Sequence, residues 1–329
     1  MKKKKIIVTG GCGFIGSHLV EVLSKKLSND IIVIDNLSTG NIKNLIKKKN
    51  VKFIKADIFS DVNLIEKYFL NVKIVFHLAA LADIVPSIDK PSEYFNSNVT
   101  GTLNMLQLAK KYGAKKFVYA ASSSCYGIPK YYPTDEKSSI LLKYPYALTK
   151  KMGEDLVKHW SDIFGIKSVS FRLFNVYGHR ARTTGTYGAV FGVFLAQKAN
   201  NKPLTIVGNG KQKRDFIYVS DVVEAFLKAE NLKSNFEIFN VGAGNPVTIN
   251  YIAKKISKKV IFIPKRPGEP DTTHADIRKI KKILNWKPKI KIDQGIKIML
   301  SNINYWKNAT IWSPVKIKKA TKNWFKYLK

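Results

Sequence analysis

Two residues near the middle of the chain have types and a spacing suited to moving a proton. Tyr146 and Lys150 lie four residues apart in a helix-like segment that begins at Pro145, so both side chains should share one face. A lysine cation beside a phenol, with a positively charged nicotinamide nearby, would lower the phenol pKa from about 10 toward neutral pH, as a general base requires. Because Tyr-x-x-x-Lys is common by chance, the motif needs support from other residues.

Three hydroxyl side chains, Ser122, Ser123 and Ser124, follow an apolar run over 116–121 that we expect to form a strand. The carboxyl ends of the strands are where doubly wound sheets bind ligands. A serine hydroxyl there could hydrogen-bond the same substrate oxygen that Tyr146 deprotonates. The serines therefore strengthen the interpretation of Tyr146 as a general base.

A glycine-rich turn near the start of the chain indicates a dinucleotide site. Gly10, Gly13 and Gly16 follow an expected strand over 4–9 and precede an amphipathic stretch over 14–27. Glycines permit the tight turn and let the backbone approach a pyrophosphate. The helix N-terminus then presents N–H groups and the positive end of its dipole to the phosphates.

An acidic residue follows the turn at the distance that a dinucleotide site requires. Asp35 lies 19 residues past Gly16, at the end of the apolar run 31–34. A carboxylate there binds the ribose hydroxyls and repels a 2′-phosphate, which predicts NAD rather than NADP. Asp57 and Ile58, after the third expected strand, could hold the adenine edge.

Apolar runs alternate with amphipathic stretches through the first half of the chain. The runs lie at 4–9, 31–34, 51–54, 73–78, 116–121 and 166–173, and the amphipathic stretches at 14–27, 60–69, 97–112 and 145–164. This alternation favours a parallel sheet covered on both faces, with right-handed crossovers. We predict an α/β fold with a doubly wound parallel (Rossmann) sheet over 1–174, to which 215–240 returns. A smaller, mostly C-terminal α/β substrate lobe should occupy 175–329.

The composition is strongly basic: 329 residues carry a formal net charge of +34. Such a balance suggests nucleic acid or an anionic membrane as a partner. The lysines are nevertheless scattered, and no arginine-rich stripe interleaves with aromatic residues, so we interpret them as a solvated surface. Cys12 and Cys125 make no disulfide framework, no apolar run reaches the roughly 18 residues of a membrane span, and no His/Cys cluster has metal-ligand spacing. We expect a cytoplasmic protein without a transmembrane segment, a specific nucleic-acid partner or a metal.

The motifs together resemble the extended short-chain dehydrogenase/reductase superfamily, and within it the UDP-glucose / UDP-N-acetylglucosamine 4-epimerase family. The resemblance covers about residues 3–300. Beyond the glycine turn and the serine and tyrosine motifs, its landmarks are Asp35-Asn36, Asp57-Ile58, His77-Leu78-Ala79-Ala80, Asn98-Val99-x-Gly101-Thr102, Tyr126-Gly127, Arg172 to Gly178, Arg214 to Val219 and Arg266-Pro267-Gly268-Glu269. Their order and spacing are specific for the superfamily, and less so for the substrate.

The resemblance implies NAD-dependent 4-epimerisation of a UDP-sugar through a transient 4-keto form, by a homodimer. Ser122 and Tyr146 would be the catalytic pair and Lys150 their helper. The implied cofactor site comprises Gly10, Gly13, Phe14, Ile15, Gly16, Asp35, Asn36, Asp57, Ile58, Leu78, Ala79, Ala80, Asn98, Tyr146 and Lys150. The implied substrate site comprises Ser122, Ser123, Ser124, Asn175, Ala189, Val190, Arg214, Arg266, Glu269 and Thr273.

Individual roles follow from position in the family motifs. Arg214 and Arg266 would grip the two phosphates, since guanidinium groups suit that task, and Glu269 would bind the uridine ribose. Asn175 would contact the diphosphate. In the segment Thr186-Tyr187-Gly188-Ala189-Val190, the last two residues would touch the uracil. Thr273 stands where a tyrosine typifies glucose-restricted epimerases, so the resemblance implies room for an N-acetyl group.

Other functions remain open at this stage. A 4,6-dehydratase or 4-reductase of the same superfamily is the main enzymatic alternative, and decarboxylases are related too. Dehydratases carry Thr-Asp-Glu, and decarboxylases a glutamate, where this chain has Ser122 to Ser124. A nucleotide-sensing Rossmann regulator and a nucleic-acid-binding protein are the non-enzymatic alternatives. The intact Ser122, Tyr146 and Lys150 set argues against the regulator, and the scattered charge argues against nucleic acid.

Two departures from the epimerase pattern stand out. Ala82 and Asp83 occupy a stretch where some epimerases show a lysine. The basic tail over 302–329 extends past the usual end of the family, and Trp306, Trp312, Trp324 and Phe325 give it apolar anchors. These anchors could pack onto the protein, form a subunit contact or touch a membrane surface.

Overall fold

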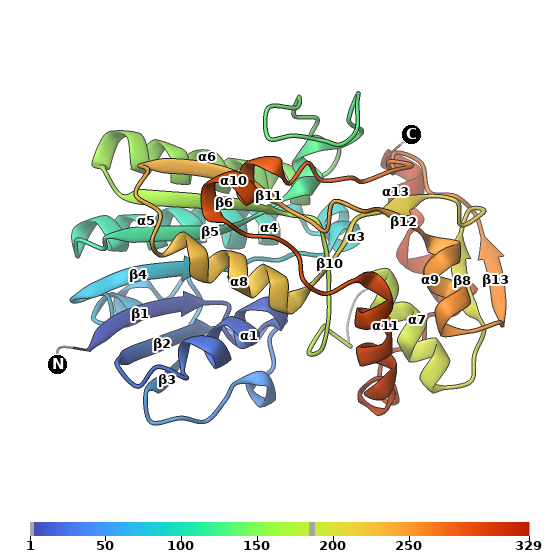
Figure 1. Ribbon diagram of the computed structural model, residues 1–329, viewed down its shortest axis with the longest axis horizontal. Helices are drawn as coiled ribbons and strands as arrows, with labels where there is room; N and C mark the ends of the chain where they lie inside the picture. The colour runs from blue at the N-terminus through green and yellow to red at the C-terminus, as the bar shows by residue number, and fades with distance from the viewer. Residues whose placement is uncertain (1–2, 184–187, 329) are drawn as a thin grey trace.

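The computed structural model describes residues 3–183 and 188–328. Its larger lobe is built on a seven-stranded sheet in the order β11-β6-β5-β4-β1-β2-β3, and every neighbouring pair in it is parallel (Figure 1). The strands are β1 (Lys4–Thr9), β2 (Asn29–Asp35), β3 (Val51–Lys55), β4 (Val72–His77), β5 (Lys116–Ser122), β6 (Lys167–Leu173) and β11 (Phe236–Val241). The predicted doubly wound parallel sheet is therefore confirmed.

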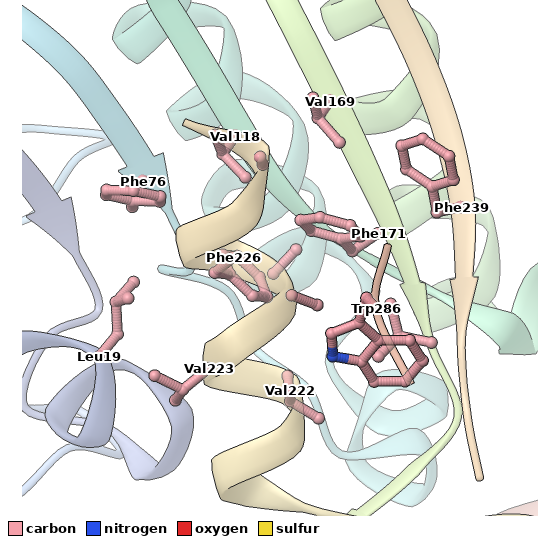
Figure 2. Close-up of a cluster of buried hydrophobic side chains, with 14 of the residues drawn as sticks. Leu19, Phe76, Val118, Val169, Phe171, Val222, Val223, Phe226, Phe239 and Trp286 are labelled. Carbon is pink, nitrogen blue, oxygen red and sulfur yellow. The ribbon is translucent and has the colours of Figure 1, made fainter. Parts of the chain in front are cut away.

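Both faces of the sheet are covered by apolar side chains, and its strands therefore appear in the sequence as continuous hydrophobic runs. In β1, Ile6 and Val8 join one buried cluster, while Ile7 joins the cluster on the other face. The first cluster includes side chains from α1 (Phe14–Leu23), α8 (Val219–Ala229) and α10 (Arg278–Leu284); the second includes side chains from α2 (Val62–Glu66), α5 (Gly101–Lys111) and α6 (Pro145–Phe164). Figure 2 shows Phe226 of α8 between Phe76 and Phe171, with ring centroids 6.4 and 5.0 Å away.

Three helices differ from the predicted amphipathic stretches. The stretch 14–27 ends early as α1, because the Asn29 side-chain amide donates to the Leu23 carbonyl at 2.8 Å and caps the last turn. Within the stretch 60–69, α2 covers only Val62–Glu66. The stretch 97–112 belongs to a longer helical run, made of α4 (Pro91–Phe95), a π turn η2 (Asn96–Thr100) and α5.

The smaller lobe is assembled from short pairs of strands and the helices between them. β7 (Asn175–Tyr177) pairs with β10 (Phe216–Tyr218), β8 (Leu204–Val207) with β13 (Val260–Ile263), and β9 (Lys213–Arg214) with β12 (Val247–Thr248). Side chains of α7 (Val190–Ala199), α9 (Ile249–Ile256) and α11 (Ile292–Ser301) share one apolar core with β8 and β10. Between β10 and β12 the chain returns through α8 and β11 to the large sheet (Figure 1).

The C-terminal tail folds onto the smaller lobe as η4 (Ile303–Trp306), α12 (Pro314–Ala320) and α13 (Lys322–Tyr327). The indoles of Trp306 and Trp324 are buried in the core of that lobe, and Trp312 packs against it, which agrees with the packing alternative for these anchors. Phe325 is 42% exposed. Within the described residues, no helix combines the length and apolarity needed to span a membrane.

Candidate active site

One continuous cavity of about 650 Å³ lies at the carboxyl ends of the sheet strands and extends against the smaller lobe. Every candidate residue from the sequence lines this cavity except Asn98. The cavity also contacts Asp83, Tyr144, Arg182, Thr310, Trp312 and Trp324, which the sequence did not single out as site residues. Segments as far apart in the chain as Gly10 and Trp324 thus meet around one space.

The glycine turn between β1 and α1 is sterically required. Gly10 has a φ of +69°, and a Cβ there would lie 2.7 Å from the Ala79 backbone nitrogen. A Cβ at Gly16 would lie 2.2 Å from the Gly10 carbonyl oxygen. Gly13 is the N-cap of α1 and provides no side-chain cap to the first-turn amides. The turn therefore fits a pyrophosphate, which could take those amides as donors.

The acidic residue after β2 is fixed by backbone amides. The Asp35 carboxylate accepts hydrogen bonds from Cys12 N at 2.9 Å and Leu37 N at 2.8 Å. Burial raises its pKa above the ordinary value, and these two bonds oppose the rise. Beside it, the Asn36 amide donates to Asp57 Oδ2 at 2.7 Å. The end of the cavity at the glycine turn is thus bordered by carboxylates.

Asn98 does not line the cavity, and its direct contact with the cofactor stays a prediction. Its side chain is 1% exposed and is used inside the protein. The amide accepts from Leu81 N at 2.8 Å and donates to Leu81 O at 3.0 Å and to Thr149 Oγ1 at 3.1 Å. The π turn η2 presents Asn98 to this loop, and the residue therefore holds the cavity-lining segment that follows β4.

The predicted catalytic side chains meet at the end of β5. Ser122 Oγ lies 2.6 Å from Ser124 Oγ, and Ser122 Oγ also accepts from Ser124 N at 3.2 Å. Tyr146 comes from the first turn of α6, whose N-cap is Tyr144 and which carries Pro145 in its first turn. The Tyr146 phenol and Ser122 are hydrogen-bonded, and this bond lowers the phenol pKa. The two hydroxyls therefore lie close together.

The predicted depression of the tyrosine pKa requires a nicotinamide as well as Lys150, and in the protein alone the direction is upward. Burial raises the pKa of the Tyr146 phenol most, the hydrogen bond with Ser122 opposes the rise, and the Asp83 charge adds a smaller increase. The charged group that acts on Lys150 is Glu154, on the same helix. The Lys150 Nζ lies 4.2 Å from the centroid of the Tyr119 ring, and burial lowers the lysine pKa to about 7. Depression of the phenol pKa thus depends on the second cation that the prediction invoked.

A salt bridge that the sequence did not predict joins two residues that line the cavity, and one of them, Asp83, acts on the pKa of Tyr146. Arg182 Nη1 donates to Asp83 Oδ2 at 2.5 Å, and both side chains are about one-third exposed or less. The two residues lie 99 positions apart, so no local motif could have paired them. Asp83 occupies the stretch where the sequence departs from the epimerase pattern.

Two arginines and one glutamate form what we call the arginine end of the cavity: Arg214, Arg266 and Glu269. Arg266 Nη2 lies 2.9 Å from Glu269 Oε1, and Arg214 Nη2 lies 3.8 Å from Glu269 Oε2. Burial lowers the pKa of Arg214, and the Glu269 charge opposes the change. Because positive groups outnumber the negative one in a secluded place, this end suits an anion.

Asn175 and Thr273 line the same cavity and contact each other. Thr273 Oγ1 donates to Asn175 Oδ1 at 3.1 Å and accepts from Asp215 N at 3.1 Å. Thr273 thus faces the cavity while it also secures the loop. Ala189 and Val190 line the cavity at the start of α7. Thr186 and Tyr187, from the same motif, lie outside the described residues.

Known proteins of similar sequence and structure are nucleotide-sugar enzymes. A Methanocaldococcus jannaschii protein, provisionally named as a UDP-glucose 4-epimerase, is 39% identical over 92% of this chain and 98% of its own length. UDP-glucuronic acid decarboxylase 4 of Arabidopsis thaliana is 33% identical over 92% of this chain and 69% of its own length. The UDP-N-acetylglucosamine 4-epimerase of Methanobrevibacter ruminantium, solved with UDP-N-acetylmuramic acid, superimposes with a TM-score of 0.85 at 33% identity, covering 92% of this chain and 99% of its own.

The family model described as the NAD dependent epimerase/dehydratase family matches residues 6–242, which include the glycine turn, the serine triplet and Tyr146 with Lys150. The fold and the glycine turn agree with this match, and NAD is the cofactor of the family. The chain therefore belongs to the NAD-dependent epimerase/dehydratase family.

Proposed function

We propose that this protein epimerises a UDP-sugar at C4, through a transient 4-keto form of the sugar. The observation that carries the proposal is the arrangement of one cavity. The Tyr146–Ser122 pair, the glycine turn and the anion-attracting arginine end all line this one cavity. A substrate with a sugar at one end and a nucleoside diphosphate at the other matches this spacing of hydroxyls and guanidinium groups. When bound at the glycine turn, NAD would supply reversible acceptance of a hydride.

The chain's own residues would bind, orient and move protons. Tyr146 takes the proton of the sugar 4-hydroxyl and later returns it, acting as general base and then general acid. Ser122 hydrogen-bonds the same oxygen and fixes its direction. Lys150, four residues further along the helix, would add its positive charge to that of the bound cofactor in favouring the ionised phenol. Arg214 and Arg266 hold the diphosphate, Glu269 binds the ribose, and the sugar turns over while its nucleotide stays fixed.

The other reactions of related proteins require groups that this strand end lacks. Elimination of water from C5 and C6 needs an acid and a base beside the sugar, whereas the end of β5 and the start of the turn after it offer hydroxyls: Ser122, Ser123 and Ser124. The carboxylate that faces Tyr146 is Asp83, and Arg182 holds it in an ion pair. These features favour epimerisation over dehydration or decarboxylation.

The proposed function is tested by product analysis. The protein is incubated with NAD and, separately, with UDP-glucose, UDP-N-acetylglucosamine and UDP-glucuronic acid, and the products are resolved by NMR. We expect C4 epimers with C6 intact. A 4-keto-6-deoxy sugar or a pentose as the accumulating product would contradict the proposal.

Selectivity for NAD over NADP should depend on the charge of Asp35. A 2′-phosphate would meet this carboxylate, and like charges brought together cost several kcal/mol. We expect the wild type to bind NAD at least tenfold more tightly than NADP, and Asp35→Asn to reduce that preference while keeping an acceptor oxygen for Cys12 N. Calorimetric titration of both cofactors into both proteins measures the ratio, and equal affinities in the wild type would refute the role of Asp35.

Substrate breadth should depend on Thr273. We propose that the space left by its small side chain accommodates an acetamido group at C2, so the wild type should act on the UDP-N-acetylhexosamine pair as well as on UDP-glucose and UDP-galactose. Thr273→Tyr would overfill that space and selectively lower kcat/KM for the N-acetylated pair. Thr272→Tyr is the matched control, because Thr272 does not line the cavity. If Thr273→Tyr leaves the ratio of kcat/KM between the N-acetylated and the non-acetylated pair unchanged, Thr273 does not determine which C2 substituents are accepted.

A further inference from the structure

The C-terminal tail forms part of the wall of the cavity. Thr310, Trp312 and Trp324 all line it, although they follow α11 in the chain. Thr310 N donates to Thr183 O at 3.0 Å, and the Trp312 carbonyl accepts from the Gln197 side chain at 2.8 Å. The tail is thus fixed along the cavity by hydrogen bonds to two earlier segments.

Trp324 of α13 packs against the arginine end. The Arg266 guanidinium carbon lies 5.7 Å from the centroid of the indole ring, within the range of a cation–π contact. The ring of Tyr144 lies on the indole as well, with 5.8 Å between centroids and an interplanar angle of 40°. Tyr144 is the N-cap of the helix that carries Tyr146. One side chain therefore touches both an arginine of the anion-attracting end and the start of the catalytic helix.

The indole is anchored from two sides. Its Nε1 donates to the Pro267 carbonyl at 2.7 Å, in the loop that carries Arg266 and Glu269. The neighbouring Asn323 amide donates to Asp89 Oδ1 at 2.6 Å, on the helix α3 (Ile84–Asp89). With 2% of its surface exposed, Trp324 fills the gap between these elements. A packed indole in this place limits the positions that the Arg266 side chain can adopt.

We propose that Trp324 is a positioning residue for substrate: it holds Arg266 and Tyr144 in the geometry that binds the nucleoside diphosphate. The tail is then a functional part of the substrate site. This inference rests on the proposed function, because it takes the arginine end to be the diphosphate site. It assigns Trp324 to binding of the nucleotide portion, which is remote from the reacting C4. Loss of such uniform binding raises KM and leaves kcat nearly unchanged.

The test compares substitutions of two similar tryptophans. Trp286 is 1% exposed and donates its indole N–H to the Asp221 carbonyl at 2.9 Å, but it does not line the cavity. Trp324→Leu should raise the Kd for UDP and the KM for the UDP-sugar about tenfold, as expected when a partly desolvated cation–π contact and its packing are lost. Trp324→Phe should restore most of this affinity by providing a ring. Trp286→Leu should lower thermal stability without changing the Kd for UDP.

Calorimetric titration with UDP and with NAD gives results that separate the possible failures. NAD affinity should change less than about twofold in each folded variant, because the contacts of Trp324 described above are with the arginine end and Tyr144, and the glycine turn shares none of them. Wild-type Kd values for UDP in Trp324→Leu would overturn the inference and leave the proposed function standing. Failure of the wild type to bind UDP would overturn both.

A second measurement uses the wild type alone, in case Trp324→Leu does not fold. Saturating UDP should slow amide hydrogen exchange in α13, because the diphosphate would fix Arg266 against the indole. NAD alone should not slow exchange in this helix. Unchanged exchange in α13 on addition of UDP would overturn the inference.

Discussion

Replacing Tyr146 by phenylalanine should lower turnover by about 10²–10⁴-fold, the range that general acid–base catalysis contributes. The phenol is the group that can exchange a proton with the sugar oxygen beside Ser122, and phenylalanine removes only that oxygen. The ring of Tyr146 packs edge-on against Tyr94, with 6.4 Å between centroids, and phenylalanine keeps this contact. We therefore expect the folded state and the affinity for NAD to persist. Steady-state kinetics with the NMR-identified substrate, together with NAD titration, measures both.

Tyr94→Phe is the matched control for this prediction. Tyr94 is buried beside the catalytic tyrosine, and its hydroxyl donates to the Asp83 carbonyl at 2.5 Å. Removing that hydroxyl should change turnover only a few-fold, since it exchanges no proton with the sugar. Near-wild-type epimerisation by Tyr146→Phe would exclude Tyr146 as the base. Equal losses in both variants would attribute the effect to packing.

We expect the largest loss of stability on removing the positive charge of the buried ion pair that joins Arg172 of β6 to Glu154 of α6. Arg172 donates two hydrogen bonds to Glu154, from Nε at 3.0 Å and from Nη2 at 2.7 Å, and both side chains are less than 5% exposed. Arg172→Met would leave the Glu154 carboxylate buried without its partner, which costs about 3–5 kcal/mol. It would also remove the donor to the Tyr126 hydroxyl at 2.9 Å. Urea denaturation followed by circular dichroism measures the loss of unfolding free energy.

The control removes both charges. Replacing a buried ion pair by apolar side chains of similar volume is often nearly neutral, because neither charge is then left without compensation. Arg172→Met combined with Glu154→Leu should therefore recover most of the stability that Arg172→Met loses. If the single substitution costs less than about 1 kcal/mol, the carboxylate is compensated by another group. A double variant less stable than the single one would show that the ion pair contributes to the free energy of unfolding beyond the mutual compensation of its charges.

Local patterns predicted the parts of this protein that local sequence determines. The Gly10–Gly16 turn, the strand that ends at Asp35 and the helical spacing of Tyr146 and Lys150 each depend on residues within one element. The parallel sheet followed from the alternation of apolar runs with amphipathic stretches. The family resemblance then named residues from distant motifs, such as Arg214 and Arg266, that line the same cavity.

What the sequence did not predict depends on contacts between distant segments. Arg182 and Asp83 lie 99 positions apart, and Trp324 reaches Arg266 only through the folding of the tail. The sequence also did not show that burial raises the pKa of Tyr146 in the protein alone, because no short window of sequence reveals burial. The hydrogen bonds of the buried Asn98 side chain to Leu81 and Thr149 likewise join segments that no local motif connects.

The position of β11 has a consequence for how the polypeptide acquires its structure. This strand pairs with β6 along all six of its residues, yet the chain builds β7 through β10 between the two. During synthesis, β6 therefore stays an open sheet edge until Val241 has left the ribosome, by which time those strands of the smaller lobe have emerged too. Neither lobe can complete its structure while the other is absent. Their unfolding should accordingly be a single cooperative event, and a nascent chain stopped before Phe236 would offer the β6 edge to chaperones or to another copy of itself.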